Sequence, residues 1–271
     1  MIQPLQPQAD PFRYGWRYVR NERPDGSVEF DQVPLTLEDV LHPQDGDVLP
    51  QNTPHDRDWT YLGEVLRGQV ADDPTALITS DLIIVWDVPG LKHHSPDLGV
   101  IFGVRDPQAK RSSFSVAEEG VRPALLIEIV SPAYRVNDVV TKVDHYHRAG
   151  VPWYVIVDRE DMDGPVRLIG YRAEMDGYVQ LPLDARGRLW LEPVGVWLGT
   201  QGNRVVCYSE TGEEIGDYVQ VTKNLAAAEA RAAEAEERAR EAEGRAAEAE
   251  TKLRELEERL RQSRNGPPPQ S

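Results

Sequence analysis

Two acidic residues stand in or beside apolar runs that we expect to be buried strands. Glu128 is the single acid in the run from 125 to 130, where Leu, Ile and Val dominate. Asp97 opens a second apolar run, from 98 to 102. An ionised carboxylate in an apolar strand is costly unless it is paired or binds a metal. Both residues are therefore candidates for a functional site or for a buried ion pair.

A lysine on the following helix is placed to join them. The chain after Glu128 turns and enters a helix, which we expect to begin with Asn137 or Asp138 as N-cap and to end before Gly150. Two residues of strand extend about 7 Å, and four residues of helix rise about 6 Å. If the helix packs back over the strand, Lys142 lies level with Glu128.

Two carboxylates and one ammonium at a single point are what metal-assisted phosphodiester cleavage requires. Asp97 and Glu128 offer the hard oxygen ligands that Mg²⁺ prefers. Lys142 offers a charge that offsets the negative charge building on the phosphate and that can orient the attacking water.

Each of these residues also has a structural alternative. Asp97 could belong to a turn, and Glu128 could pair with a buried arginine. Lys142 could pair with Asp138, four residues earlier, on an exposed helix face.

The order of these residues resembles the PD-(D/E)XK nuclease superfamily. The matching elements are Pro96-Asp97, Glu128-x-Val130, Lys142, Tyr146, Gly150-Val151-Pro152 and a strand that ends at Asp158. Within the superfamily, residues 34 to 197 are most similar to the Uma-two family of bacterial restriction endonucleases. The resemblance implies Mg²⁺-dependent (or Mn²⁺-dependent) DNA cleavage, with Asp97 and Glu128 as metal ligands and Lys142 as the third catalytic residue.

One position departs from the superfamily pattern. The superfamily places its lysine two residues after the glutamate, where this chain has Val130. In the Uma-two family the lysine is understood to lie on the following helix, which Lys142 matches.

Length and composition predict one globular body and one appendage in 271 residues, of which 40% are hydrophobic. No apolar run reaches 18 residues and the N-terminus has no basic-then-apolar pattern, so we expect a soluble protein with no membrane contact. Cys207 is the only cysteine, which excludes a disulfide framework and suits a reducing, cytoplasmic location.

The predicted organisation has four parts. They are an N-terminal arm and β-hairpin (1–33), a restriction-endonuclease-like domain (34–216), a long coiled-coil helix (217–262) and a disordered tip (263–271). Strand-like runs interrupted by the helix before Gly150, with hairpins after Asp158, predict an α/β fold: a restriction-endonuclease-like core with a mixed β-sheet flanked by helices.

The net charge argues against tight DNA binding. Residues 1–222 contain 20 Lys and Arg against 35 Asp and Glu, a balance of −15. A body this acidic repels a polyanion at long range, so contact with DNA is expected to be weak, local, or dependent on a metal or partner.

Residues 12–30 predict a β-hairpin in which arginines alternate with Tyr14, Trp16 and Tyr18. This surface could stack bases and contact phosphates, or its aromatic face could pack on the body.

Three further residues could reach the site from the N-terminal side: Asp47, His55 and Glu64. The family resemblance favours Asp47, and we expect His55 to pack or cap a helix. His93 and His94 are neighbours on an extended chain and point apart, and no third histidine has ligand spacing, so no zinc site is predicted.

From Leu225 the chain keeps a strict heptad with no polar residue at positions a and d. These positions are Leu225, Ala228, Ala232, Ala235, Ala239, Ala242, Ala246, Ala249, Leu253, Leu256 and Leu260. Position e is always glutamate and position g is basic from Arg231 onward. This charge pattern favours a parallel homodimer, although the alanine core is weak and a lone helix or a different partner stays open.

Two functions follow from these observations. The first is a metal-dependent endonuclease that hydrolyses DNA. The second is a nuclease-fold protein that no longer cleaves and acts as a coiled-coil interaction module.

Overall fold

The structure is a computed structural model that describes residues 10–49, 52–133, 135–161 and 164–264, the last without the side chains of 218–220 and 262–264. It divides into two units, Met1–Ile215 and Gly216–Ser271. The predicted disordered tip (263–271) lies outside the described residues from 265 onward, and residues 263 and 264 belong to a helix.

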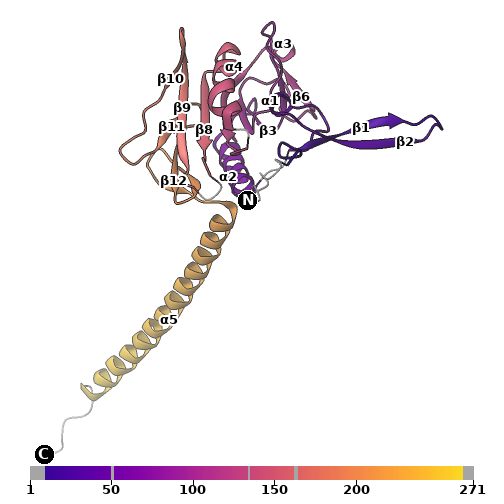
Figure 1. Cartoon of the computed structure of the whole chain (residues 1–271). Coiled ribbons are helices and arrows are strands. Elements are labelled where there is room, and N and C mark those ends of the chain that lie inside the picture. Colours follow the sequence, from indigo (N-terminus) through magenta and orange to yellow (C-terminus); the bar gives the residue numbers. More distant parts are fainter. Residues whose placement is uncertain (1–9, 50–51, 134, 162–163, 265–271) are drawn as a thin grey trace, which may run out of the picture. The chain divides into compact units, whose positions relative to one another are not determined.

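A six-stranded sheet organises the first unit, in the order β10-β9-β8-β7-β5-β3. Figure 1 labels its strands β10, β9, β8 and β3. The strands are β3 (Leu77–Ser80), β5 (Leu98–Ile101), β7 (Pro123–Ile129), β8 (Trp153–Asp158), β9 (Arg167–Glu174) and β10 (Gly177–Gln180). Only β7 and β8 pair in parallel; the other neighbours are antiparallel. The sheet is therefore mixed, which confirms the predicted fold class.

Both faces of the central strand β7 are covered, as its nearly continuous apolar sequence requires. Leu125, Ile127 and Ile129 join one buried cluster, which includes α2 (Thr53–Gln69). Leu126 and Val130 join the other, which includes Tyr146 of α4 (Lys142–Arg148). Because side chains alternate along a strand, Glu128 points to the α4 side.

The connection from β7 to β8 differs from the predicted helix at its start. It begins as a π-helical turn, η1 (Asn137–Thr141), and continues as α4. The prediction of Asn137 or Asp138 as N-cap was wrong, because no side chain caps this turn. Asp138 instead pairs with Lys142. The C-terminal prediction is confirmed, since Gly150 follows the helix with φ of 72°.

Helix α2 begins with a side-chain cap. The Asn52 side chain accepts from the backbone N of His55 at 3.0 Å, and Pro54 occupies the first turn. Leu62 and Leu66 face the core and are almost fully buried. The cap fixes the start of α2, and so the position of His55.

The predicted N-terminal hairpin consists of β1 (Trp16–Glu22) and β2 (Val28–Pro34). It projects as a two-stranded ribbon in Figure 1. Tyr18 is 58% exposed, so packing of the aromatic face on the body holds only near Trp16 at the base.

The other elements of this unit are short. They are α1 (Leu37–Leu41), the parallel pair β4 (Ile83–Val85) and β6 (Ser113–Ser115), α3 (Val116–Glu119), and a second sheet of β11 (Leu189–Leu191), β12 (Val196–Gln201), β13 (Arg204–Tyr208) and β14 (Glu214–Ile215), with the turn η2 (Glu192–Val194). Consecutive antiparallel pairing in the second sheet matches the predicted meander.

The second unit contains one helix, α5 (Tyr218–Arg264), of 47 residues. Among the described residues, no helix is both long and apolar enough to cross a membrane.

Candidate active site

A cavity of about 450 Å³ brings the three predicted site residues together. Asp97, Glu128 and Lys142 all line it. Its wall also contains the acids Asp45, Asp47, Asp81 and Asp138. The cavity lies where β5 and β7 meet the start of the β7–β8 crossover.

Glu128 is held on two sides within the core. Its Oε1 accepts from the Tyr146 hydroxyl at 2.7 Å and lies 2.9 Å from Lys142 Nζ. The residue is 2% exposed. Burial raises the pKa of Glu128 to about 8, against the opposing charge of Lys142. A cation near this carboxylate would favour its ionised form.

Lys142 lies between two carboxylates, with Nζ 2.9 Å from Glu128 and 2.8 Å from Asp138. Burial alone would lower the pKa of Lys142, but the charges of Asp138 and Glu128 outweigh burial and raise it. The side chain therefore stays protonated. The alternative of an exposed Asp138–Lys142 pair is wrong in its exposure, because both residues are buried.

Asp97 is fixed by the backbone of the neighbouring strand. Its Oδ2 accepts from Ile129 N at 2.6 Å, and its own N lies 3.4 Å from Glu128 Oε2. Its Oδ1 lies 3.3 Å from His55 Nε2. Asp97 and Glu128 are thus tied to one another across the β5–β7 pair, with room on the cavity side for a shared ligand.

His55 was expected to pack or cap, and the structure gives it a different contact. Its ring is buried and faces Asp97. Burial lowers its pKa, but the hydrogen bond to Asp97 and the charges of Asp97, Asp81 and Glu128 leave the pKa of His55 raised. The raised pKa favours the protonated ring, and the contact with His55 orients Asp97.

Two site residues were missed at the sequence level. Asp138 was considered only as a helix cap or a surface partner of Lys142. Asp81 has φ of 51°, a left-handed conformation that is uncommon outside glycine, and its N donates to Asp97 O at 3.3 Å. Although its side chain reaches solvent, the surrounding protein and the charge of Asp97 raise the pKa of Asp81 to about 7. Nothing in the sequence around Ser80-Asp81 distinguishes it from an ordinary turn.

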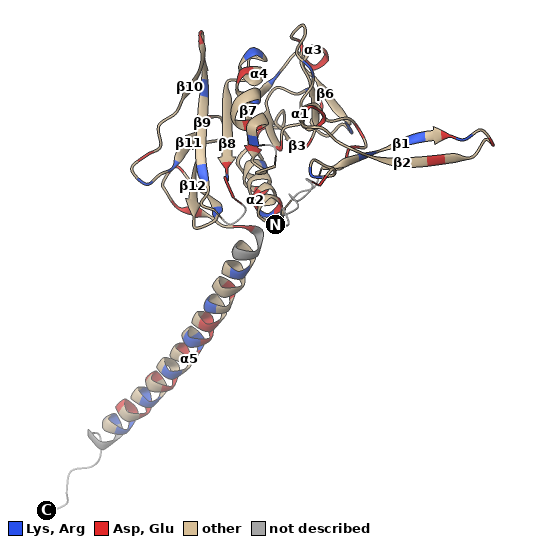
Figure 2. Cartoon of the chain, viewed as in Figure 1, with Lys and Arg blue, Asp and Glu red and all other residues tan. Residues whose placement is uncertain are grey.

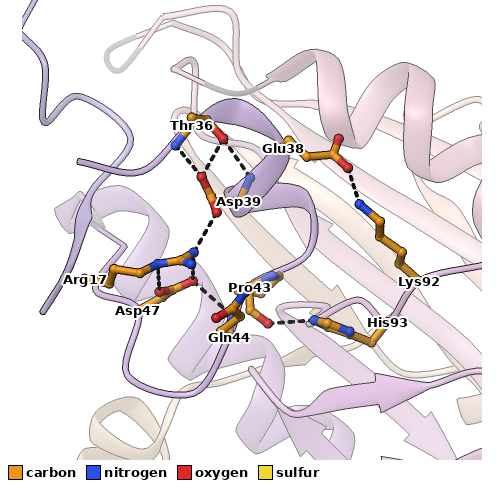
Figure 3. A network of polar contacts seen from close by, with 9 residues as sticks. All are labelled: Arg17, Thr36, Glu38, Asp39, Pro43, Gln44, Asp47, Lys92 and His93. Carbon is orange, nitrogen blue, oxygen red and sulfur yellow. Dashed lines mark hydrogen bonds and ion pairs between the residues drawn. The ribbon is translucent and has the colours of Figure 1, made fainter. Parts of the chain in front are cut away.

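Asp47 lines the cavity but is already neutralised by Arg17 of β1. Its Oδ1 lies 2.9 Å from Arg17 Nε, and its Oδ2 accepts from Gln44 N at 2.9 Å (Figure 3). Arg17 also bonds Asp39 at 2.7 Å, which ties the hairpin to α1. Glu64 is exposed on α2 and does not line the cavity, so its predicted reach to the site was wrong.

A histidine cluster lies behind the cavity. Ring nitrogens of His42, His94 and His145 lie within 4.8 Å of one another, although sequence spacing had suggested no third histidine. His93 points away, as predicted, and its Nε2 bonds the Pro43 carbonyl at 2.9 Å (Figure 3).

Hydrogen bonding within the cluster opposes metal binding. Trp86 Nε1 donates to His94 Nδ1 at 2.8 Å, so a neutral His94 carries its proton on Nε2. That nitrogen lies 2.9 Å from His145 Nδ1 and donates to it. The nitrogen that would face a metal is therefore already protonated, and burial lowers the pKa of His94 to about 2.

The candidate cavity has the opposite character, because its acids outnumber the cations beside them. Six acids line it, and Lys142 is the one lysine or arginine among the described residues of its wall. Several carboxylates with too few cations are typical of a site for a divalent metal. A buried site at the strand ends of a mixed α/β sheet is the arrangement that the resemblance to restriction-endonuclease-like proteins implies.

Comparison with known proteins gives the family. The sequence model of the Uma2 family, described as "Putative restriction endonuclease", matches residues 29–225, and the chain belongs to this family. Its general functional class is therefore nuclease.

Comparison with solved structures gives a match to a "putative nuclease belonging to DUF820" from Anabaena variabilis ATCC 29413, with a TM-score of 0.39 and 16% identity over 60% of this chain and 75% of that one. No curated protein matches significantly.

Proposed function

We propose that this protein is a Mg²⁺- or Mn²⁺-dependent endonuclease that hydrolyses DNA phosphodiester bonds. The observation that carries the proposal is the cavity in which Asp97, Glu128 and Lys142 converge. Family membership supports nuclease activity in general.

The residues present fit a hard divalent cation. Asp97 and Glu128 would hold it, and Asp81 is close enough to Asp97 for their charges to repel. All these donors are carboxylate oxygens, which Mg²⁺ and Mn²⁺ favour over soft ligands. When bound, the cation would supply Lewis-acid charge and a water of lowered pKa.

The chain's own residues have distinct roles in the proposed reaction. Lys142 stays protonated, so it does not act as a general base. Its ammonium is available to bind a non-bridging phosphate oxygen and to stabilise the added negative charge of the transition state. Tyr146 and His55 are positioning residues, because they hold Glu128 and Asp97 and do not line the cavity.

The charge of the cavity also predicts the order of binding. Arg17 pairs with Asp47 and His55 with Asp97, but the six acids of the wall still outnumber these two cations and Lys142, so a phosphodiester is repelled unless a metal cation has bound first. We therefore expect DNA affinity to depend on Mg²⁺ and to be weak without it.

The test combines binding and cleavage. Calorimetry of Mn²⁺ with the wild type and with Asp97→Ala should show a site that the substitution removes. Plasmid cleavage in Mg²⁺ should be lost in Lys142→Ala and retained in Arg148→Ala, a control that removes an exposed cation from the same helix.

A wild type that binds neither metal at millimolar concentration would overturn the nuclease proposal. The chain would then be a nuclease-fold protein that no longer cleaves and acts as a coiled-coil interaction module. The net charge of −15 over residues 1–222 also favours this alternative.

A further inference from the structure

Helix α5 presents an uninterrupted apolar stripe to solvent. Leu225, Leu253, Leu256 and Leu260 are each between 56% and 64% exposed. Together with Val221 and the alanines between them, they occupy every a and d position from 221 to 260. A helix of this length spans about 70 Å. Exposing such a stripe along all of it is unfavourable unless another surface covers it.

The charges beside the stripe select the partner. In the frame set by Leu225, position e is Glu229, Glu236, Glu243, Glu250 and Glu257, and position g is Arg231, Arg238, Arg245, Lys252 and Arg259. Figure 2 shows both signs interspersed along α5. In a parallel pair, each g residue faces the e residue five positions further along the other chain. This places Arg231 opposite Glu236 and Lys252 opposite Glu257.

An antiparallel pair would bring e beside e and g beside g, which are like charges throughout. A second copy in parallel register therefore satisfies both flanks of the stripe at once. A parallel pair shifted by seven residues would keep this charge pattern but would pair one heptad fewer.

The charges also form pairs within one helix, such as Arg238 with Glu234 at 3.0 Å and Arg254 with Glu250 at 3.5 Å. Such pairs support an isolated helix. They do not explain the apolar stripe. In a solitary helix positions a and d face water like the others, so charged residues there would add further stabilising pairs. The absence of any polar residue from a and d between 221 and 260 requires an apolar partner.

We propose that α5 is a parallel, in-register homodimerisation helix, which joins two copies of the nuclease body. The alanine core buries little area at each position. The association is therefore weakest in the middle of the stripe and strongest at the leucines from 253 to 260. This inference does not depend on cleavage, so it can fail while the proposed function holds.

Oligomeric state in the full chain is the first measurement. Sedimentation equilibrium at about ten micromolar should give twice the chain mass of 30.5 kDa. Ala239→Glu with Ala246→Glu places acids at two a positions and should weaken dimerisation by about 100-fold, since buried unpaired charges oppose association. The matched control, Ala233→Glu with Ala247→Glu, adds the same residues at b positions and should leave the dimer intact.

Charge exchange tests the flanks. Arg238→Glu with Arg245→Glu should weaken the dimer, and adding Glu243→Arg with Glu250→Arg in the same chain should restore it. Ala232→Cys tests orientation, because mild oxidation should join the two chains only if they are parallel and in register. Ala230→Cys, at the outer f position, should not cross-link, and Cys207 is buried.

Three results would overturn the proposal. They are a full chain that sediments as a monomer, a dimer that survives the paired a-position substitutions, and a dimer whose Ala232→Cys variant does not cross-link.

Discussion

The acidic cavity and the histidine cluster lie on opposite sides of one tyrosine and have opposite chemistry. The Tyr146 hydroxyl bonds Glu128 in the cavity, while its ring contacts the edge of His94 with centroids 5.2 Å apart. Burial lowers the pKa of each of the three histidines, and both ring nitrogens of His94 are hydrogen bonded. The carboxylates are crowded, and their charge exceeds that of the nearby cations. An excess of carboxylates over cations, more than the presence of ligand-type residues, distinguishes a site suited to a cation from a cluster whose polar atoms are already hydrogen bonded.

Glu128→Gln should have the largest effect, because it removes charge from the unbalanced side. The amide keeps the size of the side chain but is a poor ligand for a hard cation, so cleavage should fall by about 10²- to 10³-fold or more. Plasmid cleavage and Mn²⁺ calorimetry measure the change. Glu64→Gln, an exposed substitution on α2, is the control. Unchanged cleavage in Glu128→Gln would contradict the assignment of the acidic cavity, rather than the histidine cluster, as the metal site.

Tyr146→Phe separates the contribution of the acidic cavity from that of the histidine cluster, because Tyr146 contacts both. It deletes the hydroxyl that holds Glu128 and keeps the ring that packs against His94. The loss of this buried hydrogen bond should cost about 1 to 3 kcal/mol of unfolding free energy and lower kcat more than DNA affinity. Chemical denaturation and cleavage kinetics measure the two effects. If Tyr146→Phe lowers kcat and DNA affinity equally while Mn²⁺ binding is unchanged, Tyr146 acts through packing and does not position Glu128.

The parts of this site that could be predicted from sequence are those fixed by local pattern. Glu128 was identified because a single acid interrupts an apolar strand, and Lys142 because the lengths of helix and strand bring it level. Asp81 could not be identified, because its position depends on a left-handed backbone and on pairing between strands far apart in sequence. The histidine cluster was missed for the same reason: His42, His94 and His145 meet only through tertiary packing.

The π-helical turn was also beyond prediction from sequence. Residues 137–141 carry no signal that separates it from the first turn of an α-helix. Its consequence is nevertheless local, since it lets Asp138 turn inward to Lys142 rather than cap the helix. The ion pair with Lys142, four residues further along the chain, outweighs the capping preference of aspartate here.

His94→Gln tests the balanced side through acid sensitivity. The pKa of His94 is about 2 in the folded protein and 6.5 in the unfolded chain. Between these values only the unfolded chain takes up the proton. Stability is therefore lost as pH falls, by about 2 kcal/mol between pH 6.5 and 5. The glutamine amide can accept from Trp86 and donate to His145 without titrating. Urea unfolding at the two pH values should show that the variant loses about that much less than the wild type, and an equal loss would contradict a neutral cluster.

Asp81→Asn should have the smallest effect. Asp81 makes stability fall as pH rises, whereas His94 makes stability fall as pH decreases. The pKa of Asp81 is about 7 in the fold against 3.8, so the folded protein retains a proton that the unfolded chain releases between these values. Stability falls as pH rises through this window. Asparagine removes the penalty, and after discounting for the exposed side chain the variant should gain about 1 kcal/mol over the wild type between pH 4 and 8 in a chelating buffer.

Asparagine also tolerates the left-handed backbone at this position, but that contribution does not change with pH. The pH dependence of the difference between Asp81→Asn and the wild type therefore isolates the electrostatic part. Saturating Mg²⁺ should shrink the difference, because a cation beside Asp97 relieves the repulsion that raises the pKa of Asp81. A difference that is constant with pH and indifferent to Mg²⁺ would show that Asp81 is strained but not part of the charged cavity.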